Sequence, residues 1–297
     1  MKSTKKILKK DMKKMRELVN IHIDRHLPKK DEYPKIIHKA MRYSLFAGGK
    51  GVRSYLAIAT YKLFSDDIDL MIPLAAAMEI IHTYTLIHDD LPYLDDDDFR
   101  RGKKSCHNMF GQDIALLAGD ALLIYAMEII ATMEIDNGQR ATITKLFTQH
   151  IGATGLIGGQ FMDIESENNQ VSVSTLRYIH SHKTGKFFNL AIKLTNILGK
   201  PNEEEAKNLI NYSDTIGLLF QVVDDILDIE SNLKSLGKTV GKDIMANKAT
   251  YPSVFGLDIS KQEANRLLEK AKGYLNIFEK KAEMLLHFTD FIATREY

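Results

Sequence analysis

The sequence has a single cysteine, Cys106, no tryptophan and only six prolines in 297 residues. One cysteine excludes an internal disulfide framework and a zinc site built from cysteines, and it fits a reducing compartment such as the cytoplasm. The scarcity of proline leaves long stretches that can form uninterrupted helix.

Strong net charge and long hydrophobic runs are also missing. The formal net charge is +1, so no global field draws the chain to nucleic acid or to a membrane surface. The basic start of the chain is not followed by the apolar run of a secretory signal. Leu8, Met12, Met15 and Val19 instead recur at helical spacing, which predicts a solvated amphipathic helix. No segment reaches the roughly eighteen uncharged apolar residues of a membrane span. We therefore expect a soluble cytoplasmic protein with no nucleic-acid partner and no stable membrane insertion.

Apolar residues recur at spacings of three and four along much of the chain, as in residues 116–125. This spacing is typical of helices, whereas alternating strand patterns are scarce. Turn signals at residues 48–51, 137–138 and 199–202 separate the helical stretches, and no low-complexity linker divides the chain. We predict an all-α protein with one domain over residues 1–297.

Carboxylates and apolar residues share one predicted helix at residues 220–228. At about 100° per residue, Gln221, Asp224, Asp225 and Asp228 project toward one side of it. Like charges at this spacing destabilise a helix by roughly 0.2–0.5 kcal/mol per pair, so a cation should compensate. Carboxylate oxygens are ligands for magnesium, which keeps water or substrate phosphate on its other positions. The pattern predicts a magnesium-diphosphate site.

A second acidic segment follows the apolar residues 80–87. Six of the eleven residues from 88 to 98 are aspartates. Pro92 disfavours continuing the helix and should place Asp95 on a turn, so Asp89, Asp90 and Asp95 can surround a cation from two directions. A solvated acidic face or an adventitious calcium site is the alternative for either motif alone. Two such motifs in one chain favour a metal site.

Metal-bound phosphates also need basic side chains, because they carry more negative charge than the metal ions remove. A glycine turn at residues 48–53 presents Lys50 and Arg53 and suits a phosphate. The other basic candidates are Arg100, Arg101, Lys183 and Lys238. Each alone has a simple alternative, such as charge balance.

In this order, the motifs resemble those of the short-chain trans-prenyl diphosphate synthases, specifically the bacterial farnesyl diphosphate synthase type, over residues 40–256. Residues 82–102 resemble the first aspartate-rich motif of that family, and residues 224–228 resemble the second. The resemblance implies an all-helical, single-domain bundle of the isoprenoid synthase type around a deep central cavity, usually as a homodimer. It also implies a reaction. An allylic diphosphate, dimethylallyl or geranyl, ionises with magnesium assistance, the double bond of isopentenyl diphosphate attacks the cation, and a proton leaves to give farnesyl diphosphate.

Roles carry over from the family to the matching positions. Three magnesium ions, with manganese as a substitute, would be held by Asp89, Asp90, Asp95, Asp224, Asp225 and Asp228. The allylic diphosphate would contact Arg100, Lys183 and Lys238. Isopentenyl diphosphate would contact Lys50, Arg53, His82 and Arg101. The catalytic candidates are Lys183, Thr184 and Gln221, with Gln160 lining the same cavity. The departing diphosphate would take the proton, so no side-chain base is needed.

Product length is predicted from the residues that precede the first motif. Thr85 and Tyr84 lie four and five positions before Asp89, about 6 to 7.5 Å along a helix. In the family, bulk there limits the growing chain, so Tyr84 argues for a farnesyl product, although an ordinary core tyrosine is the alternative. The sequence departs from the family at Gly51 and Ser54, where a basic residue and a proline are common, which puts the strength of isopentenyl diphosphate binding in doubt.

Three other functions fit part of this pattern. A geranylgeranyl diphosphate synthase would share every motif. A class I terpene cyclase also ionises a prenyl diphosphate with three magnesium ions, but two aspartate-rich motifs, cations for a second diphosphate and the absence of tryptophan argue against it. A non-catalytic subunit need not retain both carboxylate sets.

Overall fold

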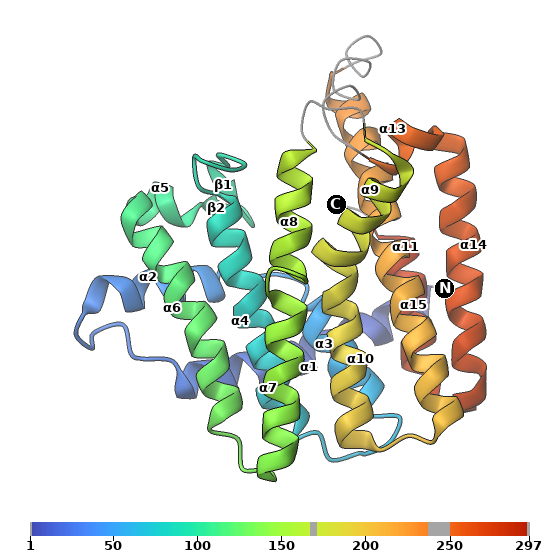
Figure 1. Ribbon diagram of the computed structural model, residues 1–297, viewed down its shortest axis with the longest axis horizontal. Helices are drawn as coiled ribbons and strands as arrows, with labels where there is room; N and C mark the ends of the chain where they lie inside the picture. Colours follow the sequence, from blue (N-terminus) through green and yellow to red (C-terminus); the bar gives the residue numbers. More distant parts are fainter. Residues whose placement is uncertain (1, 167–170, 237–249, 296–297) are drawn as a thin grey trace. The chain divides into compact units, whose positions relative to one another are not determined.

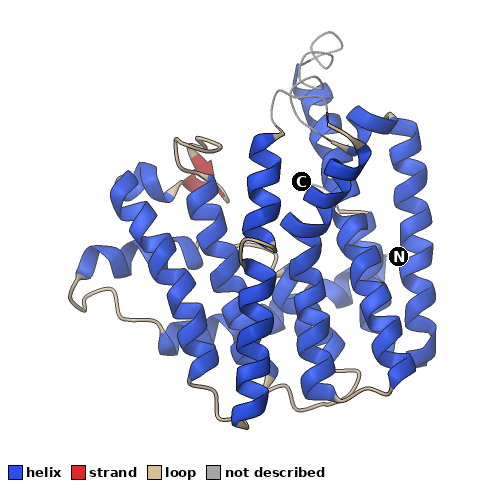
Figure 2. Cartoon of the chain, viewed as in Figure 1, coloured by secondary structure: helices blue, strands red, loops and turns tan. Residues whose placement is uncertain are grey.

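The computed structural model of the chain describes residues 2–166, 171–236 and 250–295. Helices make up nearly all of its regular structure, as Figure 2 shows. Two short strands, β1 (Phe99–Arg100) and β2 (Lys103–Lys104), form an antiparallel pair. The all-α prediction is confirmed. The described chain divides into two compact units, residues 9–144 and residues 145–297 together with 1–8.

The unit of residues 9–144 is built around α4, which packs against α3 and α6. Its helices are α1 (Lys2–His26, from residue 9 onward), α2 (Lys35–Leu45), α3 (Val52–Tyr61), α4 (Met71–Asp89), α5 (Cys106–Phe110), α6 (Gln112–Ala131) and the first half of α7 (Asn137–Ile151). These helices are labelled in Figure 1. The alanines at residues 75–77 of α4 are fully buried, and such small side chains let neighbouring helices approach closely. α4 is therefore a core helix, and it leads directly into the first acidic segment.

A close contact anchors the end of α4 on α6. Nε2 of His88 lies 3.0 Å from the carbonyl oxygen of Leu116. A Cβ atom at Gly119 would come within 2.1 Å of the same nitrogen, so only glycine leaves room for the imidazole ring. The residue directly before Asp89 is thus held by packing rather than left at a frayed helix end.

The N-terminal helix has the predicted amphipathic character. Met12, Met15 and Val19 are 6%, 3% and 0% exposed, while Lys13 and Lys14 between them are exposed. The expectation of a solvated helix is therefore right for one face only, because the other face is buried.

α6 corrects the expectation that no segment could span a membrane, because it is long and apolar enough to do so by length and composition alone. The core helix of a soluble protein passes the same test. Ala115, Ala118 and Leu122 are fully buried within the fold, and Asp120 lies near the middle of the helix.

The unit of residues 145–297 is built around the long helix α11, which packs against α10, α14 and α15. Its elements are α8 (Leu156–Glu165), α9 (Val173–Ile179), the π-helical segment η1 (His180–Gly185), α10 (Lys186–Gly199), α11 (Glu203–Leu236), α13 (Tyr251–Phe255), α14 (Leu257–Leu275), the 3-10 segment η2 (Asn276–Ala282) and α15 (Glu283–Ala293). Asn202 and Glu205 exchange two hydrogen bonds of 2.9 Å at the start of α11. This reciprocal cap starts the helix directly after the turn signal at residues 199–202.

Candidate active site

The first acidic segment folds back on the end of α4. α4 ends at Asp89, and beyond Pro92 the backbone N–H of Asp95 donates a 2.8 Å hydrogen bond to the carbonyl oxygen of Asp89. The turn predicted from Pro92 is confirmed. It brings the main chain of Asp95 next to that of Asp89, while the side chain of Asp95 remains exposed.

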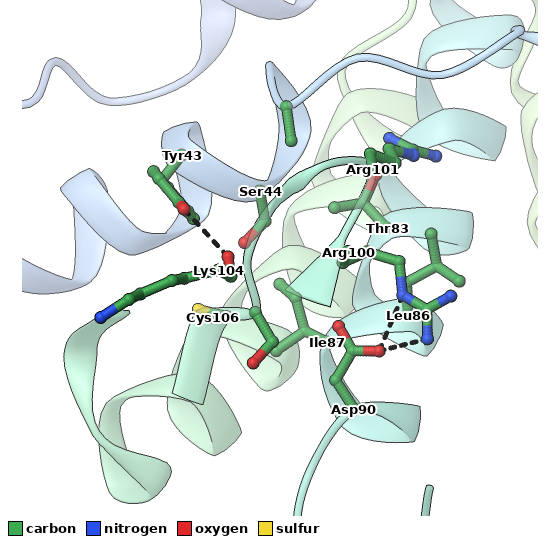
Figure 3. Close-up of a pocket in the computed structure, with 12 residues that line it drawn as sticks. Tyr43, Ser44, Thr83, Leu86, Ile87, Asp90, Arg100, Arg101, Lys104 and Cys106 are labelled. Carbon is green, nitrogen blue, oxygen red and sulfur yellow. Dashed lines mark hydrogen bonds and ion pairs between the residues drawn. The ribbon is translucent and has the colours of Figure 1, made fainter. Parts of the chain in front are cut away.

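Asp90 differs from its neighbours because it is buried and paired with an arginine. Its side chain is 2% exposed, and its Oδ1 accepts a 2.8 Å hydrogen bond from Nε of Arg100 and a second from Nη2, as Figure 3 shows. Arg100 also reaches Asp97 at 2.5 Å. Burial raises the pKa of Asp90, and the guanidinium group of Arg100 opposes that shift. Asp90 therefore fixes the side chain of Arg100 beside the first acidic segment.

A small pocket opens beside this ion pair. Its lining includes Thr83, Leu86, Asp90, Arg100, Arg101 and Cys106. The thiol of Cys106 is buried, and this burial raises its pKa. The pocket thus puts two arginines and an apolar helix surface next to each other, within the unit of residues 9–144.

The four residues predicted to contact isopentenyl diphosphate all belong to that same unit. Nη1 of Arg53 lies 3.3 Å from Nε2 of His82. Burial, then the charges of Arg53, Arg101 and Arg100, hold the pKa of His82 well below 6.5. A neutral imidazole can accept a hydrogen bond from an arginine, and it leaves the positive charge of the arginines available.

Arg101 contacts the backbone of the glycine turn. Nη1 of Arg101 donates to the carbonyl oxygen of Gly48. A Cβ atom at Gly49, whose φ is 129°, would come within 2.9 Å of the Arg101 guanidinium carbon. The turn therefore needs glycine at this position for its backbone conformation, and a side chain there would displace the guanidinium group of Arg101.

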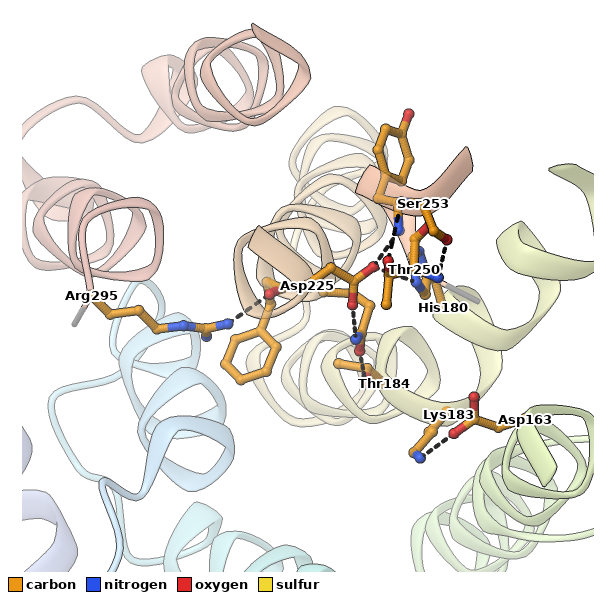
Figure 4. A network of polar contacts seen from close by, with 11 residues as sticks. Asp163, His180, Lys183, Thr184, Asp225, Thr250, Ser253 and Arg295 are labelled. Carbon is orange, nitrogen blue, oxygen red and sulfur yellow. Dashed lines mark hydrogen bonds and ion pairs between the residues drawn. The ribbon is translucent and has the colours of Figure 1, made fainter. Parts of the chain in front are cut away.

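Buried Asp225 is the centre of a polar network in the other unit (Figure 4). Its Oδ2 lies 3.2 Å from Nε2 of His180 and accepts a 2.7 Å hydrogen bond from the backbone N–H of Tyr251. Its Oδ1 accepts a 2.9 Å hydrogen bond from Gln221. Both carboxylate oxygens are thus engaged by protein groups, which argues against Asp225 as a metal ligand and leaves that role a prediction.

Two of the catalytic candidates are joined through the same network. Oγ1 of Thr184 donates a 2.9 Å hydrogen bond to Oε1 of Gln221. Thr184 lies in η1, and π-helical turns of this kind are frequent at functional sites. A chain of contacts therefore runs from Asp225 through Gln221 to Thr184.

Lys183, the third catalytic candidate, is held by a partner that the sequence did not indicate. Its Nζ contacts Oδ2 of Asp163 at 2.5 Å. A Cβ atom at Gly159 would lie 2.2 Å from the backbone nitrogen of Lys183, so glycine lets α8 approach η1. Gln160, the next residue of α8, is partly exposed. These contacts place α8 and the lysine of η1 side by side.

Asp224 also has a partner from far along the chain. Nη2 of Arg295, whose side chain is 5% exposed, contacts Oδ1 of Asp224 at 2.5 Å. The same guanidinium group lies 3.5 Å from the centre of the Phe220 ring and donates to the Phe220 carbonyl. Asp228 is exposed. The predicted role of Lys238 falls outside the described residues.

Tyr84 is a core residue, as the alternative interpretation of its role requires. It is 5% exposed, its ring packs edge-on against His88, and burial raises the pKa of its hydroxyl to about 12. Within the described chain that hydroxyl has no hydrogen-bond partner. The hydroxyl of Thr85, by contrast, donates a 2.9 Å hydrogen bond to the carbonyl oxygen of His82. Tyr84 thus supplies bulk rather than a polar contact.

The candidate metal ligands are the right type of donor for magnesium, but they do not form an assembled cluster. Among the residues described, no group of three or more His, Cys, Asp and Glu side chains is arranged around a common point. Arg100 and Arg295 contact two of the six candidate carboxylates, and Asp225 is engaged elsewhere. The remaining donors are all carboxylate oxygens, including those of exposed Asp95 and Asp228, and this donor type suits magnesium.

Sequence reasoning did not identify three site residues, because their partners are distant in the chain. Asp163 pairs with Lys183 across 20 positions. His180 lies within reach of Asp225, 45 positions away. Arg16 of α1 donates to the carbonyl oxygen of Gly49, 33 positions away. No local spacing pattern signals such pairs.

Comparison with known proteins gives a consistent result. The chain matches the polyprenyl synthetase family over residues 34–286. A dimethylallyltranstransferase from Fischerella ambigua is 43% identical over 89% of this chain and 78% of its own length. A geranylgeranyl diphosphate synthase from Cyanophora paradoxa is 41% identical over 94% of both chains. A solved structure of an FPP/GFPP synthase from Zymomonas mobilis, in its apo form, is 31% identical with a TM-score of 0.86, over 98% of this chain and all of that one.

The helical fold and these likenesses define an isoprenoid synthase with the all-α prenyltransferase fold. Family membership follows from the extent of the match. The chain belongs to the polyprenyl synthetase family, and it is a prenyltransferase.

Proposed function

We propose that the chain condenses isopentenyl diphosphate with dimethylallyl or geranyl diphosphate to give farnesyl diphosphate. One observation carries the proposal. The unit of residues 9–144 contains an acidic segment and, separately, a glycine turn that carries Lys50, is followed by Arg53 and is contacted by Arg101. An enzyme that ionises one diphosphate and binds a second needs both kinds of site.

The proposed chemistry assigns distinct tasks to the two substrates. The carbon–oxygen bond of the allylic substrate breaks, and the leaving diphosphate keeps the electron pair. The double bond of isopentenyl diphosphate then attacks the cation, and the proton lost from the adjacent carbon goes to the released diphosphate. Lys183 and Arg100 would offset the charge of the leaving group, and Thr184 and Gln221 would present oxygens to the cation.

Asp89 and Asp95 would hold magnesium in the unit of residues 9–144, with Asp90 supporting Arg100, and Asp224 and Asp228 would hold magnesium in the other unit. When bound, magnesium supplies the neutralisation that lets a diphosphate leave. The protein's own contribution is to position the two diphosphates and to exclude water from the cation.

A geranylgeranyl product is the second candidate, because relatives 41% to 44% identical carry that name. The buried bulk of Tyr84, five positions before Asp89, supports the shorter product. The test is to incubate the protein with magnesium, isopentenyl diphosphate and geranyl diphosphate, to hydrolyse the products with an added phosphatase, and to identify the resulting alcohols by mass spectrometry. Farnesol supports the proposal. Geranylgeraniol as the main product overturns the shorter chain length, and no extension by folded protein overturns the synthase function.

We further propose that two copies of the chain associate. Leu116, Leu117 and Ile124 on α6 are 47%, 56% and 67% exposed, and an apolar face of this kind favours a second copy over solvent. Light scattering should give twice the monomer mass. Ile124→Lys should lower it toward one monomer, whereas Lys62→Glu, a charge change at the exposed end of α3, should leave it unchanged.

A further inference from the structure

Arg16, in the middle of α1, contacts the glycine turn from outside the motif. Its Nη1 donates to the carbonyl oxygen of Gly49, and Arg101 donates to the carbonyl oxygen of Gly48. Two guanidinium groups therefore hold consecutive carbonyls of the turn that carries Lys50. All of these residues belong to the unit of residues 9–144.

The stem of Arg16 also covers the turn at Gly51, the last of its three glycines. Gly51 has a φ of 61°. A Cβ atom built there would lie 3.5 Å from Cγ and 3.6 Å from Cδ of Arg16. The side chain of Arg16 thus occupies the space beside Gly51 and brings its charge to the turn from another helix.

Positive charge exceeds negative charge around this turn. Arg16 and Arg101 contact it, Lys50 lies in it and Arg53 follows it in the sequence. Glu79 accepts a 3.2 Å hydrogen bond from the backbone N–H of Ser54, and its charge offsets part of that of Arg101. The pKa of Arg101 is lowered chiefly by burial, with repulsion from Arg100 and Arg16 adding to the shift. An anion bound at the turn would relieve this repulsion.

The guanidinium group of Arg16 also has an unused donor. Its Nε is buried and has no hydrogen-bond partner within the described part of the chain. A buried donor of this kind is costly to leave unpaired. Arginine can contact a phosphate through two parallel N–H groups, so an anion placed beside the turn would use this donor as well.

We propose that Arg16 is a substrate-binding residue, which with Lys50, Arg53 and Arg101 binds the diphosphate of the isopentenyl substrate. This rests on the proposed function. The cluster contains no set of carboxylates, so binding at it does not require magnesium. Arg16 then supplies from α1 a cation that residue 51 of the glycine turn does not provide.

The test compares Arg16→Met, which keeps an apolar stem over Gly51 but removes the charge, with Arg16→Lys, which keeps both. Lys13→Met, on the same helix and 71% exposed, is the matched control. Isopentenyl diphosphate is titrated calorimetrically into each protein in EDTA. Steady-state kinetics with magnesium then give KM for isopentenyl and geranyl diphosphate separately.

Loss of a charge-assisted hydrogen bond should weaken binding of isopentenyl diphosphate by about 10- to 100-fold in Arg16→Met. KM for geranyl diphosphate and kcat should stay within about threefold. Arg16→Lys should recover only part of the affinity, because lysine keeps the charge but not the two parallel N–H groups. An unchanged isopentenyl affinity in Arg16→Met overturns the inference, and so does an equal rise in both KM values. If Arg16→Met does not fold, Arg16→Gln takes its place, and a wild-type affinity for isopentenyl diphosphate in that variant overturns the inference. A wild-type protein that extends no allylic substrate overturns the proposed function instead.

Discussion

Asp225 is expected to act through the structure of its unit rather than through a metal ion, and the substitution Asp225→Asn tests this. Asparagine keeps the shape of the side chain and one acceptor oxygen. It replaces the other oxygen with an NH₂ group, which would face either the amide of Gln221 or the imidazole of His180 and the N–H of Tyr251. At least one buried donor loses its acceptor whichever way the new amide points.

The expected loss of stability follows from these contacts. An unsatisfied buried polar group costs about 1–3 kcal/mol, and more where the lost partner is a carboxylate. Because asparagine still satisfies one side of the network, we expect the free energy of unfolding to fall by about 2–4 kcal/mol. Urea denaturation followed by circular dichroism in EDTA measures it without any contribution from metal. Asp228→Asn, an exposed neighbour on the same helix, should change it by about 0.5 kcal/mol or less.

Activity measurements distinguish a structural role of Asp225 from a role as metal ligand. Displacement of Gln221 would also displace Thr184, which donates to it, so Asp225→Asn should lower kcat at every magnesium concentration. A lost metal ligand would instead raise the magnesium concentration needed for half-maximal rate. Wild-type stability in EDTA together with activity restored by excess magnesium would refute the reasoning.

Three further outcomes are expected. Tyr84→Ala should lengthen the product, measured by mass spectrometry, whereas Tyr84→Phe should not, because the hydroxyl has no partner among the described residues. Gly119→Ala should cost about 1–3 kcal/mol of unfolding free energy by forcing a methyl group onto His88; His88→Ala should suppress most of this cost in the double variant, and Gly273→Ala, in open space, should cost nothing. Burial, then His26 and Arg25, lower the pKa of His22 to about 4. The unfolded chain therefore binds the proton first, and stability should fall as the pH drops from about 6.5 to 4, less steeply in His22→Gln.

Much of the fold was predictable because its signals are local. The apolar spacing of Met12, Met15 and Val19 marks the buried face of α1, and Asn202 marks the start of α11. Pro92 marks the turn that brings the backbone of Asp95 to that of Asp89. Such signals lie within a few residues of the structure that they specify. The division into two compact units was not predicted, since no change in composition accompanies residue 144.

The candidate site was predictable in its residue types and less so in its contacts. The carboxylates and cations of the motifs are those that the sequence indicates. The sequence treats Asp224 and Asp225 as equivalent, because they are neighbours on one helix. In the structure one is a third exposed and pairs with Arg295, while the other is buried and pairs with His180. The direction of each side chain relative to the core decides this difference, and it depends on helices distant in sequence.

The arginine partners of the acidic motifs have a consequence for binding. A run of aspartates repels itself, and in the structure described here Arg100 and Arg295 each offset part of that repulsion. A metal ion that takes Asp224 as a ligand must compete with a guanidinium group that is itself largely buried, so the exchange is less favourable than binding to an isolated carboxylate. A diphosphate changes this balance, because it can accept hydrogen bonds from an arginine that a metal ion displaces. Metal and diphosphate should therefore bind together more tightly than either binds alone, since each relieves the charge that the other leaves unpaired.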